Sequence, residues 1–253
     1  MKLKYQKHGN GKPIVLIHGF PLDSKMWTDT AESLIAEGFQ VILPDLRFEA
    51  NIEDSLANTA ESIAHIIISL KLKKVIVGGL SMGGYVSFNL YRLYPELVAA
   101  LILCDTNSSA DSTEKRNSRF ETIDQLNEKG NQALLDSMLE NLFSKEILSK
   151  RPDIVEKVKQ WIEDSDVNNN ISALKAMANR IDHDYLLNKI NIPTKIIFGE
   201  NDKITDLTIA NKLHQNIKNS ELSIIPNAGH LSNLEQPVLF NASILDFVTR
   251  IND

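Results

Sequence analysis

The sequence contains a single cysteine, no long apolar run and no excess of basic residues. Cys104 has no second cysteine with which to form an internal disulfide or a multi-thiolate metal site. Nowhere do about 18 apolar residues follow one another, so no membrane-spanning helix is predicted. The formal net charge of −6 gives no support to a nucleic-acid partner, because binding phosphates needs a basic face. With no apolar leader at the N-terminus, we expect a cytoplasmic protein.

Glycine is scarce in the middle of the chain, which also lacks apolar runs typical of strands. Between residues 107 and 188 the one glycine is Gly130. The clearest segments there have helical periodicity and cover residues 131–143, 152–162 and 171–181. We interpret residues 107–188 as an all-helical cap inserted into the domain.

On both sides of this stretch, short apolar runs alternate with segments of helical period. Four runs lack polar alternation, as expected for strands covered on both faces, and cover residues 13–18, 41–43, 75–78 and 101–104. Two further segments, residues 194–198 and 221–225, also look like strands. Helical segments between and after them include residues 56–70, 85–93, 207–213 and 236–248. This alternation predicts an α/β core with a mostly parallel sheet and helices on both faces, formed by residues 1–106 and 189–253.

A serine stands between one of these runs and a helical segment, flanked by glycines. After the run at residues 75–78 the sequence continues Gly79-Leu80-Ser81-Met82-Gly83. G-x-S-x-G between a strand and a helix is the pattern of a nucleophile elbow, where a strained turn lifts the serine hydroxyl clear of the sheet. Side chains at Gly79 and Gly83 would collide with neighbouring backbone in such a turn. The alternative is a tight glycine turn whose serine only caps the helix.

A serine nucleophile needs a base and an acid that orients it. Of the six histidines, His230 is the best candidate because it lies in a loop between the last apolar run and the last helix. Asp202 follows the run at residues 194–198, and the order Ser81, Asp202, His230 is the one expected for such a fold. Asp105 follows another run and is a rival for the acid, with Glu200 a weaker one.

Acyl transfer also needs N–H donors for the oxyanion. Met82 follows the nucleophile, so its backbone N–H is one candidate. The loop after residues 13–18 can supply the other from Phe20, because Gly19 allows a close backbone approach. His18 is assigned a role in shaping that loop.

Together these residues resemble the α/β-hydrolase superfamily, and in particular 3-oxoadipate enol-lactonases and related carboxylesterases. The resemblance rests on residues 80–86 (LSMGGYV), 94–96 (YPE), 103–106 (LCDT) and 229–237 (GHLSNLEQP). It implies a mostly parallel eight-stranded sheet with a helical cap. Dehalogenases and epoxide hydrolases of the superfamily need aspartate at the nucleophile position, so Ser81 argues against both.

The sequence departs from the superfamily's pattern in the loop after residues 41–43. The usual D-x-R-G-x-G-x-S reads DLRFEANI here, from Asp45 to Ile52, with both glycines absent. Enol-lactone specificity therefore does not follow from the resemblance.

The leading hypothesis is a serine hydrolase that cleaves a small to medium ester or lactone through an acyl-enzyme, with no metal or organic cofactor. One alternative is a cofactor-free perhydrolase, like the haloperoxidases of this fold, and another is a non-catalytic ligand-binding protein on the same scaffold. Part of the cap's apolar side chains should line the substrate pocket and the rest should pack against the core; the candidates are Phe120, Leu134, Met138, Leu142, Phe143, Trp161 and Met177. Trp27 could border the pocket or belong to the core.

Overall fold

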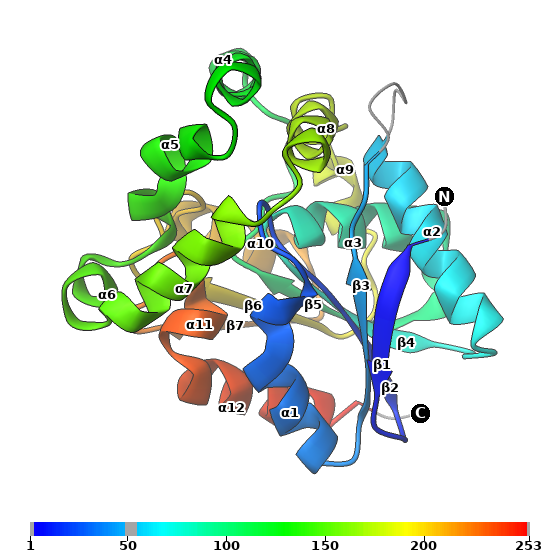
Figure 1. The fold of residues 1–253 in the computed structure, drawn as a ribbon. Coiled ribbons are helices and arrows are strands. Elements are labelled where there is room, and N and C mark those ends of the chain that lie inside the picture. Colours follow the sequence, from blue (N-terminus) through cyan, green and yellow to red (C-terminus); the bar gives the residue numbers. More distant parts are fainter. Residues whose placement is uncertain (1–2, 49–54, 252–253) are drawn as a thin grey trace.

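The computed structural model describes residues 3–48 and 55–251, and its centre is one seven-stranded sheet (Figure 1). The strands lie in the order β1-β3-β2-β4-β5-β6-β7. They are β1 (Lys4–His8), β2 (Pro13–Ile17), β3 (Gln40–Asp45), β4 (Val75–Leu80), β5 (Val98–Cys104), β6 (Thr194–Gly199) and β7 (Ser220–Ile225). The pair β1–β3 is antiparallel and all other pairs are parallel.

The four apolar runs and the two further segments correspond to β2 through β7, which confirms a mostly parallel sheet. The expected number of eight strands was wrong, because the described residues form seven. That number came from the resemblance, and residues 3–12, the described part of the chain before β2, supply only β1. Every residue of β1 is exposed at the sheet edge, so this strand has no apolar run by which the sequence would reveal it.

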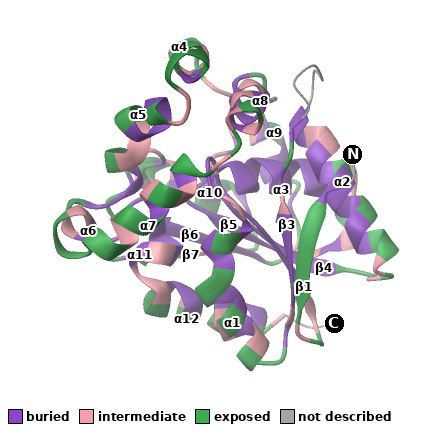
Figure 2. Ribbon diagram, viewed as in Figure 1, coloured by how far each residue is buried: buried purple, intermediate pink, exposed green. Residues whose placement is uncertain are grey.

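Helices cover both faces of the sheet. On one face, α1 (Thr28–Ala36) packs against α12 (Pro237–Val248), and on the other α2 (Ser55–Ser69) packs against α3 (Met82–Leu93) (Figure 1). Two further core helices, α10 (Leu207–Asn216) and α11 (Ser232–Glu235), follow β6 and β7. Figure 2 shows the consequence, with buried residues along the central strands and exposed residues on β1 and the outer sides of the helices. No helix among the described residues is long and apolar enough to cross a membrane.

Six helices of the described chain lie between β5 and β6, inside the stretch that we interpret as a cap. They are α4 (Thr113–Lys129), α5 (Gln132–Leu142), α6 (Lys145–Lys150), α7 (Pro152–Glu163), α8 (Val167–Ala178) and α9 (Asp184–Leu187). The helices α4, α5, α7 and α8 lie together beside the sheet (Figure 1). The sequence did not reveal α4, because only Ile123 and Leu126 of its 17 residues are buried.

The parallel strands direct five loops toward one edge of the sheet. Because β2, β4, β5, β6 and β7 run in the same direction, their carboxyl ends meet there, and in parallel sheets this is where ligands bind. The segments that begin at this edge carry His18, Ser81, Asp105, Asp202 and His230.

Candidate active site

Ser81 occupies a strained turn between β4 and α3. Its φ of 53° and ψ of −113° lie outside the regions that a residue with a side chain prefers, and such strain is common at functional sites. The turn is held by the Ser81 N–H, which donates to the Cys104 carbonyl at 2.9 Å, and by the Thr106 hydroxyl, which donates to the Ser81 carbonyl at 2.7 Å. Thr106 lies at the end of the LCDT segment, and no role for its hydroxyl was predicted from the sequence.

The glycines on either side of Ser81 are required by close packing. A Cβ atom at Gly79 would lie 2.3 Å from the Gly83 carbonyl oxygen, and one at Gly83 would lie 2.1 Å from the Ile17 carbonyl oxygen. Real Cβ atoms do not approach backbone oxygens so closely. The start of α3 therefore lies directly against β2, as the expected collisions imply.

His230 and Asp202 are hydrogen-bonded to each other in a buried position. The distance from His230 Nδ1 to Asp202 Oδ2 is 2.8 Å. Because an ionised carboxylate can only accept, Nδ1 carries the proton and Nε2 is left to receive one. Burial alone would raise the pKa of Asp202, but the charge and hydrogen bond of His230 and hydrogen bonds from Thr205 keep that pKa below its usual value.

Thr205 also contacts the pair formed by His230 and Asp202, and it was not predicted from the sequence. Its hydroxyl donates to Asp202 Oδ2 at 2.5 Å, and its backbone N–H donates to Asp202 Oδ1 at 3.0 Å. An aspartate followed three residues later by threonine is a common side-chain-to-backbone turn, and this spacing could have pointed to Thr205.

Asp105, the rival acid, is engaged elsewhere. Its Oδ1 accepts from the Gly199 N–H at 2.7 Å and its Oδ2 from the Ser232 hydroxyl at 2.5 Å. Burial, followed by the negative charge of Asp202, raises the pKa of Asp105 well above its usual value. The structure thus joins Asp202 to His230, whereas Asp105 ties the end of β5 to the segment after His230. The weaker rival, Glu200, accepts from the backbone N–H of Asn227 at 3.0 Å.

Hydrogen bonds of Ser232 and Glu235 hold the loop that carries His230 in place. Ser232 reaches Asp105 at the end of β5, and β5 is the sheet neighbour of β4, so the loop extends from β7 toward Ser81. Oε2 of the buried Glu235 accepts from the N–H groups of Gly229 and Ser144, each at 2.9 Å. Burial raises the pKa of Glu235. Since Ser144 lies just before α6, Glu235 connects the histidine loop to the cap.

The loop after β2 lies on the other side of Ser81. A Cβ atom placed on Gly19 would be 3.5 Å from the Ser81 Cβ, so this backbone passes beside the nucleophile candidate. His18 shapes the loop: its Nε2 accepts from the Leu46 N–H at 2.9 Å, and its Nδ1 donates to the Gly19 carbonyl at 3.1 Å. Burial lowers the pKa of His18, which agrees with a neutral ring that both donates and accepts.

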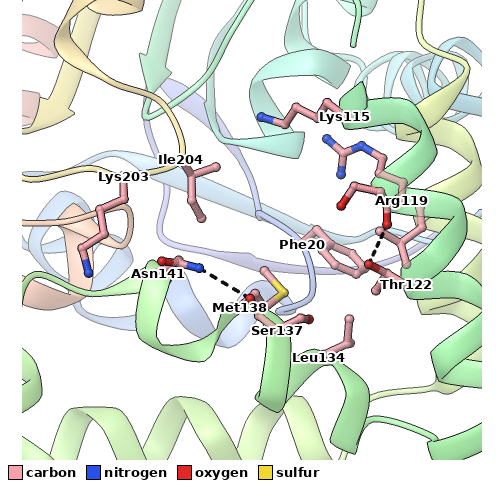
Figure 3. Close-up of a pocket in the computed structure, with 12 residues that line it drawn as sticks. Phe20, Lys115, Arg119, Thr122, Leu134, Ser137, Met138, Asn141, Lys203 and Ile204 are labelled. Atoms are coloured by element: carbon pink, nitrogen blue, oxygen red, sulfur yellow. Dashed lines mark hydrogen bonds between the residues drawn. The ribbon is translucent and has the colours of Figure 1, made fainter. Parts of the chain in front are cut away.

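Beyond Phe20 a cavity of about 400 Å³ lies between the cap and the sheet edge (Figure 3). Its wall includes Phe20 from the loop after β2, Lys203 and Ile204 from the segment after Asp202, and residues of α4, α5 and α8. Its volume is in the range of small-molecule sites.

The expected pocket residues divide between the cavity and the core. Leu134 and Met138 line the cavity. Leu142 and Phe143 are fully buried, and Met177 is nearly so. Phe120 and Trp161 lie beneath the cations of Arg116 and Lys157, each 5.0 Å from the ring centre. Trp27 belongs to the core, where its ring centre is 6.1 Å from that of Phe240.

The glycine-free loop after β3 contacts the cap. The Phe48 N–H donates to the Asn169 side-chain oxygen at 3.1 Å, and the Asn169 amide donates to the Leu46 carbonyl at 3.3 Å. Asn169 belongs to α8, so the first part of this loop is attached to a cap helix. Residues 49–52 of the loop lie outside the described residues.

The profile of the family described as "alpha/beta hydrolase fold" matches residues 12–163, which is more than half of the chain. The chain belongs to the α/β-hydrolase fold family. A thermophilic esterase from Thermogutta terrifontis, solved with malate bound, superposes with a TM-score of 0.93 at 32% identity, covering 99% of this chain and 94% of its own. The 3-oxoadipate enol-lactonase 1 of Acinetobacter baylyi is 27% identical, covering 96% of this chain and 90% of its own length.

Other α/β-hydrolase relatives carry names of a different activity. A protein of Synechocystis named as a non-heme chloroperoxidase is 28% identical, covering 96% of this chain and 94% of its own length. The family and its esterase and enol-lactonase relatives support hydrolysis of a small molecule as the activity of this α/β-hydrolase. Among residues 3–48 and 55–251, no three histidine, cysteine or acidic side chains group in a way that could hold a metal ion.

Proposed function

We propose that this protein is a serine hydrolase that cleaves a carboxylic ester or lactone through an acyl-enzyme, with Ser81 as nucleophile, His230 as base and Asp202 as the acid. The hydrogen bond from His230 Nδ1 to Asp202 is the observation that carries the proposal. It orients the imidazole with Nε2 available to accept a proton, and the carboxylate stabilises the imidazolium that forms. The elbow at Ser81 and the histidine loop directed toward β5 add to this support.

The mechanism has two similar halves. His230 takes the Ser81 proton as the hydroxyl oxygen attacks the substrate carbonyl, and the protonated His230 then delivers a proton to the leaving alkoxide. Water attacks the acyl-enzyme in the same manner and releases the acid with a free Ser81. The backbone N–H groups of Phe20 and Met82 hold the oxyanion in both halves. Neither N–H has an acceptor within the described parts of the chain, which suits donors kept for the substrate.

Replacing the nucleophile tests the proposal directly. Ser81→Ala should lower kcat for p-nitrophenyl butyrate by a factor of about 10⁴ or more, while circular dichroism and Tm stay close to those of the wild type. Ser149→Ala, at an exposed cap position, is the matched control and should retain full activity. A Ser81→Ala enzyme that turns over the ester at a comparable rate would refute the proposal.

The similarity to the Synechocystis protein named as a non-heme chloroperoxidase favours a second candidate function, in which hydrogen peroxide accepts the acyl group. In a perhydrolase, hydrogen peroxide replaces water and the product is a peracid, with Ser81 in the same role. Peracid formation above the uncatalysed background, lost in Ser81→Ala, would favour this second function. A non-catalytic ligand-binding protein would show neither reaction.

A further inference from the structure

The cavity between cap and sheet edge carries positive charges on its wall and no negative ones. Of its 12 lining residues, Lys115, Arg119 and Lys203 are cationic, and none is aspartate or glutamate. The chain as a whole has a formal charge of −6. The charge of the cavity wall is therefore opposite in sign to that of the molecule, and such a wall attracts an anion.

Arg119 is held in place by a carboxylate that it shares with a second arginine. Its Nε donates to Asp111 Oδ2 at 2.5 Å, and Arg180 Nη1 lies 2.5 Å from Asp111 Oδ1. The Asp111 side chain is fully buried, and that of Arg180 is 3% exposed. Two guanidinium groups on one carboxylate leave an excess positive charge beside the cavity.

Lys115 adds a second positive charge one helical turn before Arg119. The two residues are four apart on α4, where like charges repel each other. Figure 3 shows both Lys115 and Arg119 extending from α4 on the same side of the cavity. Within the described residues, the Lys115 ammonium has neither an ion pair nor a hydrogen bond. An anion between the two groups would relieve this repulsion.

The third cation is directed elsewhere. Lys203 Nζ donates to the backbone carbonyl of Glu140 at 3.2 Å, near the end of α5. Lys203 lies across the cavity from Lys115 and Arg119 (Figure 3). The anion-attracting wall is therefore the part formed by α4.

The cavity leads from this wall to the loops of the candidate active site. Phe20 follows Gly19, which passes beside Ser81, and Ile204 lies two residues after Asp202. Three apolar side chains of α5 and α8 also line the cavity, namely Leu134, Met138 and Leu174. A ligand that fills the cavity would therefore meet both an apolar part of the wall and the cations of α4.

We propose that Lys115 and Arg119 form a subsite for a carboxylate on the substrate, so that the ester or lactone carries an acidic group separated from the reacting carbonyl by an apolar segment. The inference rests on the proposed function for the position of that carbonyl. Arg119 uses Nε and Nη2 on Asp111, and one N–H of Nη1 contacts the Met177 sulfur at 3.6 Å. The second N–H of Nη1 and the Lys115 ammonium remain for the ligand. One guanidinium N–H and one ammonium suit a monoanionic carboxylate better than a phosphate dianion.

Binding to the Ser81→Ala variant tests the subsite without requiring catalysis. Calorimetry would compare monoethyl glutarate, adipate and suberate with their neutral ω-carboxamide counterparts. For the best chain length, the carboxylate should bind about three- to tenfold tighter than the carboxamide, as expected for a partly exposed charged contact. Lys115→Gln should bring this ratio close to one, and Lys115→Glu should invert it. Lys129→Glu, at the far end of α4 and outside the cavity, should leave the ratio unchanged.

Two results would overturn the subsite. One is that no carboxylate binds more tightly than its carboxamide counterpart at any chain length, either because the two affinities are equal or because no carboxylate binds measurably. The other is a preference for carboxylate that does not respond to substitution of Lys115. The failure of the proposed function would look different: the binding preference would persist, but wild-type protein would hydrolyse these esters and p-nitrophenyl butyrate no faster than Ser81→Ala.

Discussion

The two buried aspartates near His230 have pKa values shifted in opposite directions. Asp202 is stabilised as a carboxylate by His230 and Thr205, so its pKa is lowered although it is buried. Asp105 is fully buried near the negative charge of Asp202, and its pKa is raised. A carboxylate that stays ionised can orient His230 and stabilise the imidazolium, so Asp202 is the acid in the proposed mechanism.

Exchanging each aspartate for asparagine separates these roles. Asp202→Asn should lower kcat for p-nitrophenyl butyrate by about 10³- to 10⁴-fold, because an amide favours the wrong tautomer of His230. In Asp105→Asn the side-chain oxygen can still accept from Gly199, and the loss in kcat should stay within about tenfold. Steady-state kinetics on both variants measures the difference. A larger loss in Asp105→Asn would assign the acid role to the rival.

Within the cap, a cluster of charged groups links α4 to α8 and to the core. Asp111 precedes α4 and binds Arg119 of that helix, and it also binds Arg180, which follows α8. The Arg180 guanidinium lies over the ring of Tyr85 in α3, 4.4 Å from its centre. With only two buried residues of its own, α4 depends on this cluster for its position and thereby for the position of Lys115.

Removal of the negative charge from this cluster should destabilise the protein. Asp111→Asn leaves two guanidinium groups without a counter-charge, and we expect the free energy of unfolding to fall by about 3 to 5 kcal/mol. Denaturant titration measures this change, with Asp124→Asn on the outer side of α4 as control. A loss below about 1 kcal/mol would contradict the role assigned to the cluster.

The same cluster gives the stability a defined pH dependence. Burial would raise the pKa of Asp111, but Arg119 and Arg180 lower it below its usual value. A carboxyl whose pKa is lower in the folded state stabilises the fold fully above its unfolded pKa of about 3.9, and this contribution is lost as pH falls through the folded pKa. The stability difference between wild type and Asp111→Asn should therefore be constant near neutral pH and shrink in acid.

Helices and strands could be predicted from the sequence where their buried residues form a pattern of apolar residues along the chain. The strands β2 to β6 were predicted because covered parallel strands are mostly apolar, as in the fully buried β4. The edge strand β7 is only half-buried and was predicted from its apolar residues Leu222, Ile224 and Ile225. The exposed β1 and the polar α4 leave no such pattern, since one is held by backbone pairing with β3 and the other by the Asp111 cluster.

At the scale of the whole molecule, the site depends on contacts between distant parts of the chain. The residues expected at the site could be named individually because each follows an apolar run, and the parallel sheet brings such ends together. The cavity could not be predicted, since it joins Phe20, Lys115 and Ile204 from three separate segments. Periodicity does not say which side of a cap helix faces the sheet, so Leu134 and Met138 could not be separated from Leu142 and Phe143.

The measurement that tests the central claim most directly is covalent labelling with a fluorophosphonate, followed by peptide mass mapping. We expect one adduct per chain, located on Ser81, because its hydroxyl should attack the phosphonate as it would attack the substrate carbonyl. The label should be absent from Ser81→Ala and strongly reduced in a His230→Ala variant that retains its fold. Folded wild-type protein that takes up no label, or takes it up at another residue, would contradict the assignment of Ser81 as the nucleophile.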